Sequence, residues 1–443
     1  MSIRLKTIDL LGQTSIGRWY RFVKESQYWN EEEIKAWQDN KLRQIVEHAC
    51  KNVPYYQSLF RELKLKPDDI RTRADLVKLP VIGRKDLQNN YDRLIAANYK
   101  QFKPQFRSTG GTTGEPVKYL SDLNTWSLHW ALKFRTMEWS GYRIGDKVAV
   151  MGGASVIPEI KTGFRRKIWN RLNNLYPMPA SHMNDSILSE FADTISTKKI
   201  SCLRGYPSSV AVFARFCSDN NIKLFIPHII TTAEVLQPVY KEEIKKAFNP
   251  VLIDSYGCAD GGGSANTCSA DNGFHVSMES AVWEVCTTGG KPVQENESGE
   301  VTLTSLTNYA MPLLRYQPGD VIENLLNYDR CNCGCTLPRI SQILGRSMDI
   351  LHFQNGINLG GPAFNTMLRN FPLIKWQMIQ NDMVSVDVNF VPSGEFNSGH
   401  EKEIIRLLQY HCGSGVTIRM HKVREIPAPQ SGKQRVIINN TIR

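Results

Sequence analysis

The middle of the chain alternates short apolar segments with helical ones. KVAVM (147–151), KLFIPHIIT (223–231) and VLID (251–254) have the length and composition of buried strands, while residues 187–197 and 239–247 have helical periodicity. Parallel strands need long crossover connections, which are usually helices. The alternation therefore predicts an α/β region with an at least partly parallel sheet.

Helical periodicity also extends over residues 29–64, where Pro54 interrupts it. The apolar residues that recur there at helical spacing are Ile34, Trp37, Leu42, Ile45 and Val46.

The last hundred residues have a different order of elements, which suits a small α+β domain. We expect a strand pair in ILHFQNGINL, a helix in PAFNTMLRNF, strands in IKWQMIQ and VSVDVNFV, an amphipathic helix in EKEIIRLLQYHC and a last strand in GVTIRMHKV. The boundary is expected near LGRSMDIL (344–351), which divides the chain into domains at residues 1–344 and 345–443.

Composition excludes several classes of protein. Apolar residues make up 41% and charged residues 22%, as in ordinary soluble globular proteins. No apolar run approaches the ~20 residues of a membrane span, and the N-terminus lacks the apolar core of a signal peptide. The ten cysteines are not laid out as a small disulfide scaffold, so we expect a cytoplasmic protein.

The net charge of +11 suggests an anionic partner. The sequence contains no zinc-finger helix, no aromatic RNA-binding signature and no dense basic arm, so nucleic acid is not the expected partner. A phosphorylated small molecule or an anionic membrane face accounts for the charge equally well, and a solvated surface accounts for most of the lysines.

Residues 106–119, FRSTGGTTGEPVKY, combine glycines with hydroxyl side chains. Glycines allow the backbone to approach a ligand closely, and hydroxyls and free N–H groups suit a phosphate. The stretch is not a Walker loop, because Glu115 stands where that motif has lysine. By itself it fits a tight hairpin equally well. The candidate phosphate ligands are Ser108, Thr109, Gly110, Gly111, Thr112, Thr113 and Gly114.

Four further stretches follow this loop in order: DSYGCADGG (254–262), PLLRYQPGDVIE (312–323), LGRSMDIL (344–351) and IPAPQSGKQR (426–435). Together the five resemble the signatures of the adenylate-forming superfamily of acyl-CoA synthetases and adenylation domains. VPYYQSLF, LRGYPSSV and the cluster CNCGC make the chain most similar to phenylacetate–CoA ligase-like proteins, and within them to the branch of capsular polysaccharide biosynthesis CapK proteins.

This resemblance implies a large N-terminal α/β domain and a small mobile C-terminal α+β domain. It also implies an activity. A carboxylic acid would react with ATP to give an acyl-adenylate and pyrophosphate, and the acyl group would pass to coenzyme A or to an amine of a sugar or amino acid. The acid itself cannot be inferred from the sequence. Homodimers are common among such proteins, and the oligomeric state of this one stays open.

The resemblance also assigns roles to single residues. Tyr256 and Gly257 would flank the adenine and the acyl pocket, and Asp260 would bind magnesium. Asp320 would accept hydrogen bonds from the ribose hydroxyls, and Arg346 would reach the ribose or the phosphates. Lys433 would be the catalytic residue, with its ammonium group between the carboxylate and the α-phosphate.

Each residue also has a structural interpretation. Taken alone, Asp320 fits a turn, Arg346 a surface position and Tyr256 the core. Two positions depart from the family pattern, because Ala259 replaces a threonine and Met348 replaces the hinge aspartate. These departures motivate an alternative, a non-catalytic nucleotide-binding scaffold, against which the presence of Asp320 and Lys433 counts.

The cysteine cluster suggests a metal site. Cys331 and Cys333, with Cys268 and His275 upstream, supply the three sulfurs and one nitrogen of a closed tetrahedral zinc site. The phenylacetate-ligase-like branch has a similar arrangement, which implies a structural zinc ion near the nucleotide site. The alternative is a set of free buried cysteines.

Residues 163–176, GFRRKIWNRLNNLY, combine basic and apolar residues at helical spacing. The apolar face would contain Phe164, Ile168, Trp169, Leu172 and Leu175. Such a helix could rest on an anionic membrane or bind a phosphorylated acceptor. It could equally pack on its own domain.

Overall fold

The structure of the 443-residue protein is a computed structural model. It describes residues 3–109, 117–152, 170–171, 174–179, 183–270, 272–294, 297–323, 328–346, 350–360, 364, 367–368, 371–427 and 435–441. Several expectations lie outside these residues: the central part of the glycine loop (110–116), Met348, Lys433 and most of the basic segment 163–176. Leu175 of that segment begins a strand, so the expected helix does not continue to residue 176.

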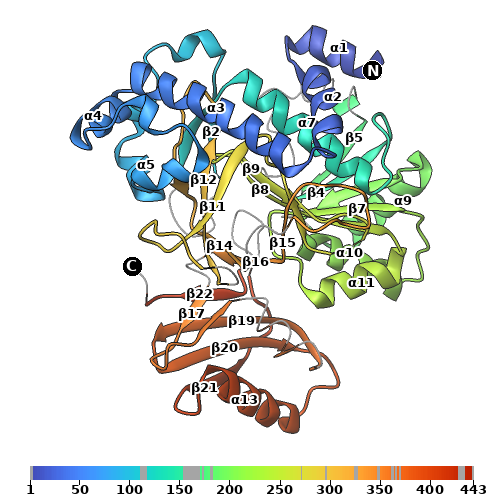
Figure 1. Cartoon of the computed structure of the whole chain (residues 1–443). Helices are drawn as coiled ribbons and strands as arrows, with labels where there is room; N and C mark the ends of the chain where they lie inside the picture. Colours follow the sequence, from blue (N-terminus) through green and yellow to red (C-terminus); the bar gives the residue numbers. More distant parts are fainter. Residues whose placement is uncertain are drawn as a thin grey trace.

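A mixed eight-stranded sheet forms the middle of the molecule (Figure 1). Its order is β15-β10-β9-β8-β7-β6-β4-β5, and the strands from β8 to β5 are parallel, as the alternation predicts. The strands are β4 (Val148–Gly152), β5 (Leu175–Pro179), β6 (Cys202–Gly205), β7 (His228–Thr232), β8 (Val251–Cys258), β9 (Gly263–Asn266), β10 (Phe274–Val276) and β15 (Arg339–Ile340).

Strand β7 is shorter than the sequence indicates. The prediction places it at residues 223–231, but pairing begins only at His228. Pro227 immediately precedes it and has no N–H group to contribute to a ladder.

Helices cover both faces of this sheet. The crossover helices are α9 (Asp185–Lys198), α10 (Pro207–Asp219) and α11 (Pro238–Phe248). Helices α9 and α11 confirm the two expected helices, whereas α10 was not predicted. Asn184 caps α9 by accepting a hydrogen bond from the Ile187 N–H group, and Pro207 and Pro238 occupy first-turn positions that suit proline. On the other face, α7 (Leu123–Trp139) packs together with α1 (Ile3–Gly12) and α2 (Ile16–Ser26).

A second sheet lies beside the first, in the order β1-β13-β12-β14-β16, with β11 paired to β12. Its strands are β1 (Ile82–Gly83), β11 (Ala281–Cys286), β12 (Gly299–Ser305), β13 (Tyr316–Gln317), β14 (Asp320–Glu323) and β16 (Gln342–Arg346). The largest hydrophobic cluster joins this sheet to α3 (Glu31–Asn52) and α4 (Pro54–Glu62).

The break between α3 and α4 falls where Pro54 predicts it. Asn30 begins α3 with a capping box to Glu33, and Pro54 begins α4. Ile34, Leu42, Ile45 and Val46 are buried as expected, whereas the Trp37 side chain is only half-buried. The remaining short elements are η1 (Pro67–Asp69), η2 (Arg73–Lys78), α5 (Arg84–Asn89), α6 (Tyr91–Leu94), η3 (Tyr99–Phe102), β2 (Gln105–Ser108) and β3 (Lys118–Ser121).

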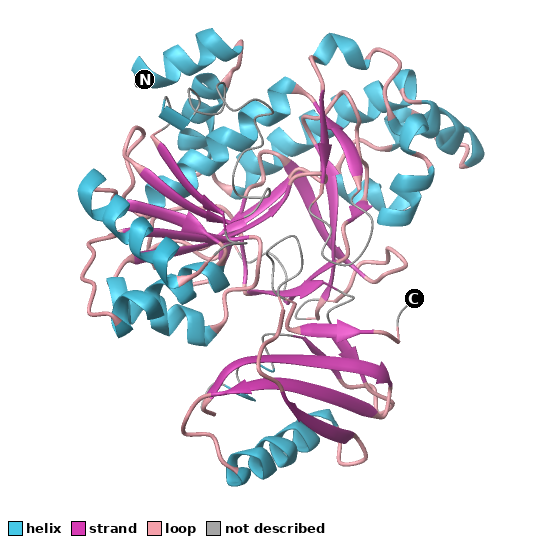
Figure 2. Cartoon of the chain, turned by 180° about the vertical axis from the view of Figure 1, so that it is seen from behind, coloured by secondary structure: helices cyan, strands magenta, loops and turns pink. Residues whose placement is uncertain are grey.

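The C-terminal part is a four-stranded sheet, β21-β20-β19-β22, with a helix on one face (Figures 1 and 2). Its elements are β17 (Ile350–His352), β18 (Asn358–Gly360), β19 (Leu373–Asp382), β20 (Ser385–Pro392), α13 (Ser398–Cys412), β21 (Thr417–Lys422) and β22 (Ile437–Asn439). The described elements have the predicted types, except that the sequence analysis missed β22. All buried residues of the local hydrophobic cluster come from residues 351–437. None of the helices described in the chain is long and apolar enough to cross a membrane.

A buried ion pair connects α7 to the β10–β11 connection and to α2. The Arg135 guanidinium contacts the Glu279 carboxylate, and the two side chains are 1% and 2% exposed. Arg135 also donates to the Val23 carbonyl, and the Ser26 hydroxyl donates to Glu279. Buried charges are stable only when paired, so loss of one partner leaves the other uncompensated.

We predict that Glu279→Ala lowers the free energy of unfolding by about 3–5 kcal/mol, because it leaves the Arg135 charge buried and unpaired. The double variant R135M/E279M should recover most of this loss. Lys35→Ala, which breaks the exposed Lys35–Glu31 pair, should cost less than about 1 kcal/mol. Urea unfolding followed by tryptophan fluorescence measures all three. Equal losses for E279A and K35A would contradict the argument.

Candidate nucleotide site and cysteine–histidine cluster

Asp320 and Arg346 face each other across two adjacent strands. Asp320 is the first residue of β14 and Arg346 the last of β16, and they are directly opposite in the antiparallel register. Gly319 precedes Asp320 with φ +83°, a left-handed conformation that favours glycine. The Arg346 Nε atom lies 3.7 Å from Asp320 Oδ1, and the aspartate and arginine side chains are only 17% and 24% exposed.

Tyr256 reaches the same carboxylate from the other sheet. It lies near the end of β8, and its hydroxyl donates a hydrogen bond of 2.6 Å to Asp320 Oδ2. The Trp283 ring packs edge-on against it, with 6.0 Å between the ring centroids. Burial and the Asp320 charge raise the pKa of the Tyr256 hydroxyl well above its usual value, so this group stays a donor. The structure thus brings Tyr256, Asp320 and Arg346 together.

The ionisation of Asp320 depends on these neighbours. Burial raises the pKa of the Asp320 carboxyl, while the Arg346 charge and the Tyr256 hydroxyl lower it. The Asp260 charge adds to the rise, and the Arg84 charge opposes it. The arginines and the tyrosine therefore offset part of the cost of holding a carboxylate away from water.

Asp260 and Gly257 lie close to Tyr256 in the sequence, but Asp260 is buried and Gly257 is exposed. Asp260 is buried, and its two carboxylate oxygens accept hydrogen bonds from the Tyr316 hydroxyl at 2.7 Å and from the Cys258 thiol at 3.2 Å. Each carboxylate oxygen can accept more than one bond, so Asp260 retains capacity for a cation. Gly257 is exposed, and a Cβ atom built on it would meet no heavy atom within 4 Å.

The glycine loop leaves the fold at the end of a hairpin. Strands β2 and β3 pair antiparallel, with Ser108 opposite Lys118. Thr109 extends this pairing, because its N–H group donates to the Val117 carbonyl at 2.9 Å and its hydroxyl accepts from the Val117 N–H group at 3.1 Å. Ser108 and Thr109 therefore form the base of the loop. The other expected phosphate ligands and Lys433 lie outside the described residues.

Two cations near this site were missed by the sequence analysis. Arg84, the first residue of α5, lowers the pKa of Asp320 and of Tyr316 by its charge. Arg107, on β2, acts in the same way on Tyr119, a buried tyrosine of β3 next to Asp260. Nothing in the local sequence distinguishes either arginine from a surface residue, because their proximity arises only from the tertiary fold.

Four candidate metal ligands come together as the sequence predicts. One ligand atom of each residue, a cysteine sulfur or a histidine ring nitrogen, lies within 4.8 Å of the other three. The residues are Cys268, His275, Cys331 and Cys333. The Cys268 and Cys331 sulfurs are 3.7 Å apart, and the Cys333 sulfur lies 3.4 Å from His275 Nε2. Tetrahedral zinc with Zn–S of about 2.3 Å and Zn–N of about 2.0 Å requires S–S and S–N separations of about 3.8 and 3.5 Å. The donor set fits zinc in type and spacing.

The histidine of this cluster is oriented by its second ring nitrogen. His275 Nδ1 lies 3.0 Å from the Leu337 carbonyl oxygen, so a proton on Nδ1 leaves Nε2 free to bind a metal. The Trp139 ring packs edge-on against the imidazole at 5.5 Å. This arrangement joins the β9–β10 connection to the loop before β15.

Sequence comparisons relate the chain to known proteins. Residues 360–440 match the family of CapK C-terminal domains. The chain is 26% identical to Protein CapK of Staphylococcus aureus over 451 aligned residues, which cover 99% of this chain and 96% of the relative. It is 25% identical to a phenylacetate-coenzyme A ligase of Thermus thermophilus over 345 residues, which cover 77% and 76% of the two chains.

Among solved structures, 2-hydroxyisobutyryl-CoA ligase in its postadenylation state superposes with a TM-score of 0.75 at 17% identity, covering 94% of this chain and 91% of the other. The same ligase in its thioesterification state gives a TM-score of 0.61. The relatives support an adenylate-forming ligase. The chain is homologous to CapK and to the phenylacetate-coenzyme A ligases, and it has the fold of the adenylate-forming CoA ligases.

Proposed function

We propose that this protein activates a carboxylic acid with ATP as an acyl-adenylate and then transfers the acyl group to a nucleophile. The observation that carries this proposal is the Asp320 carboxylate, held between Tyr256 and Arg346 where β8, β14 and β16 meet. A fixed anionic acceptor suits the two hydroxyls of a ribose. Gly257, exposed next to Tyr256, leaves room for a planar base.

In the first step, a carboxylate oxygen of the acid attacks the α-phosphorus of ATP, and the bond to the bridging oxygen breaks to release pyrophosphate. Negative charge accumulates between the acid and the α-phosphate. The Lys433 ammonium group, in the sequence position that the resemblance assigns to this role, would neutralise that charge. Magnesium, for which Asp260 offers a carboxylate, would supply charge neutralisation at the phosphates.

In the second step, a nucleophile attacks the acyl carbonyl carbon and AMP leaves. Two relatives favour coenzyme A as this nucleophile, namely the phenylacetate-coenzyme A ligase and the 2-hydroxyisobutyryl-CoA ligase. In that case the thiol loses its proton and a thioester forms. An amine of a sugar or amino acid, giving an amide, is the other acceptor consistent with the relationship to CapK.

A non-catalytic nucleotide-binding scaffold is the alternative. The observation that favours this alternative is Ala259, which is exposed beside Asp260 and has no hydroxyl group. The hydrogen bond between Tyr256 and Asp320 favours nucleotide binding whether the protein is a ligase or a scaffold. Only turnover separates the two.

We further propose that the cysteine–histidine cluster holds a structural zinc ion. Cys268, Cys331, Cys333 and His275 Nε2 would be the four ligands, which leaves no open position for a substrate. The ion would join two loops that border β10 and β15, the strands at one edge of the large sheet.

ATP–pyrophosphate exchange tests the proposed function. We expect exchange that depends on an added acid when the protein is supplied with pools of aryl, fatty, amino and sugar acids. Lys433→Ala should lose it by at least about a hundredfold, because it removes the transition-state charge partner. Subsequent assays with and without coenzyme A would identify the acceptor. MgATP binding without exchange in any pool would favour the scaffold.

Asp320 should also make ATP binding depend on pH. As the pH falls through the raised pKa of Asp320, the carboxyl becomes protonated and ATP affinity decreases. Arg346→Gln removes a charge that lowers this pKa, so the midpoint of the loss should move upward by about one pH unit. Calorimetric titration with ATP across a pH series measures the shift. The control is Arg73→Gln, which breaks a separate Arg73–Asp39 pair and should leave the midpoint unchanged.

The zinc proposal predicts one equivalent of zinc in the purified protein, measured by plasma mass spectrometry. Cys331→Ser should lose the metal and lower the melting temperature, since metal binding to the folded state contributes to stability. Cys335→Ala should retain the metal, because that cysteine lies outside the four-ligand set. A structural zinc ion would be contradicted by wild-type protein that is purified without zinc. It would also be contradicted by a melting temperature that a chelator leaves unchanged.

A further inference from the structure

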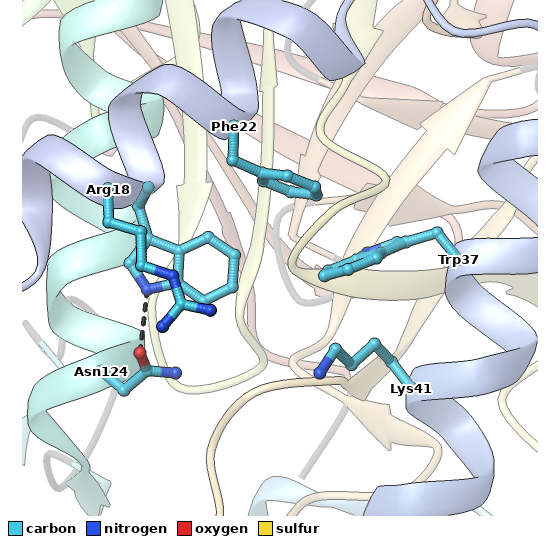
Figure 3. Close-up of a pocket in the computed structure, with 6 residues that line it drawn as sticks. Arg18, Phe22, Trp37, Lys41 and Asn124 are labelled. Atoms are coloured by element: carbon cyan, nitrogen blue, oxygen red, sulfur yellow. Dashed lines mark hydrogen bonds between the residues drawn. The ribbon is translucent and has the colours of Figure 1, made fainter.

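A pocket between α2, α3 and α7 contains none of the residues assigned to the nucleotide site (Figure 3). Its volume is ≈ 300 Å³, and it is lined by Arg18, Trp19, Phe22, Trp37, Lys41 and Asn124. Helices α2 and α3 lie at the end of the molecule away from the C-terminal sheet (Figures 1 and 2). The pocket is therefore separate from the proposed ligase chemistry.

Aromatic rings form one side of this pocket. Phe22 lies 4.5 Å from Trp37 and 5.4 Å from Trp19, measured between ring centroids. All three side chains are half-buried, so part of their surface faces the cavity. The Trp19 Nε1–H group donates to Asn124 Oδ1 at 2.9 Å, which fixes the position of that indole.

Two cations occupy the other side. Arg18 and Lys41 extend from different helices toward the same part of the cavity, below the Phe22 and Trp37 rings (Figure 3). The Lys41 Nζ atom lies 5.1 Å from the Trp37 ring centroid and donates to Gln44 Oε1. Within the described part of the chain, neither cation forms an ion pair with a carboxylate.

This placement has an electrostatic cost. Burial lowers the pKa of Lys41, and the charge of Arg18 lowers it further. Two like charges directed into one cavity destabilise each other, and an anion between them would remove the repulsion. The uncompensated pair therefore indicates a ligand with negative charge.

We propose that this pocket binds a small organic phosphate that carries a planar ring, as a nucleoside monophosphate does. A phosphate monoester carries a charge of about −1.5 to −2 at neutral pH, which matches two cations better than a carboxylate does. Arginine and lysine side chains are both suited to phosphate oxygens. The exposed faces of Phe22 and Trp37 offer a surface for the ring, because planar rings stack favourably on aromatic side chains.

The proposal is tested by calorimetric titration of the full-length protein with phenyl phosphate, with inorganic phosphate and benzyl alcohol as its separate parts. The test variant is R18Q/K41Q. The matched control is R21Q/R43Q, which removes two exposed positive charges from the same helices but none from the pocket. Trp37→Leu tests the ring surface. Circular dichroism confirms that each variant is folded.

We expect phenyl phosphate to bind the wild type and R21Q/R43Q equally, and R18Q/K41Q at least about tenfold more weakly, since the double variant removes two charged hydrogen-bond donors. W37L should weaken binding of phenyl phosphate but not of inorganic phosphate. Equal binding to both double variants, or no binding of phenyl phosphate to the wild type, would overturn the proposal. So would inorganic phosphate binding as tightly as phenyl phosphate.

Discussion

The Asp320 carboxylate connects the two sheets of the large part of the molecule. It belongs to β14, it pairs with Arg346 of β16 in the same sheet, and it accepts a hydrogen bond from Tyr256 of the neighbouring sheet. Burial raises the pKa of the Asp320 carboxyl, and the Arg346 charge and the Tyr256 hydroxyl oppose that rise. The same contacts that lower the pKa of Asp320 also fix the direction of its side chain, as the proposed recognition of ribose requires.

Sequence reasoning located this group because its members lie in ordered motifs. It also found the α/β alternation, the break at Pro54 and the cysteine–histidine cluster. The domain boundary near residue 345 and the role of Lys433 stay predictions. The errors have physical causes: Pro227 shortens β7, and β22 is a short strand whose partner β19 lies more than fifty residues away. Arg84 comes close to Asp320, and Trp37 to the proposed phosphate pocket, only in the folded chain.

The positive charge of the chain is distributed over several local tasks. Arg135 forms a buried ion pair with Glu279, and the charges of Arg346 and Arg84 lower the pKa of Asp320. Arg18 and Lys41 instead face a cavity with aromatic walls. A net charge of +11 therefore does not indicate one anionic partner, because different cations serve stability, the proposed nucleotide site and the proposed phosphate pocket.

The central claim is that Asp320 recognises ribose hydroxyls. Calorimetric titration with ATP and with 2′,3′-dideoxyadenosine triphosphate, using the wild type and Asp320→Ala, tests it most directly. The account predicts that the wild type binds ATP at least about tenfold more tightly than the dideoxy analogue, and that Asp320→Ala loses this preference. Equal affinity of the wild type for both nucleotides, or a preference that survives in the variant, would contradict it.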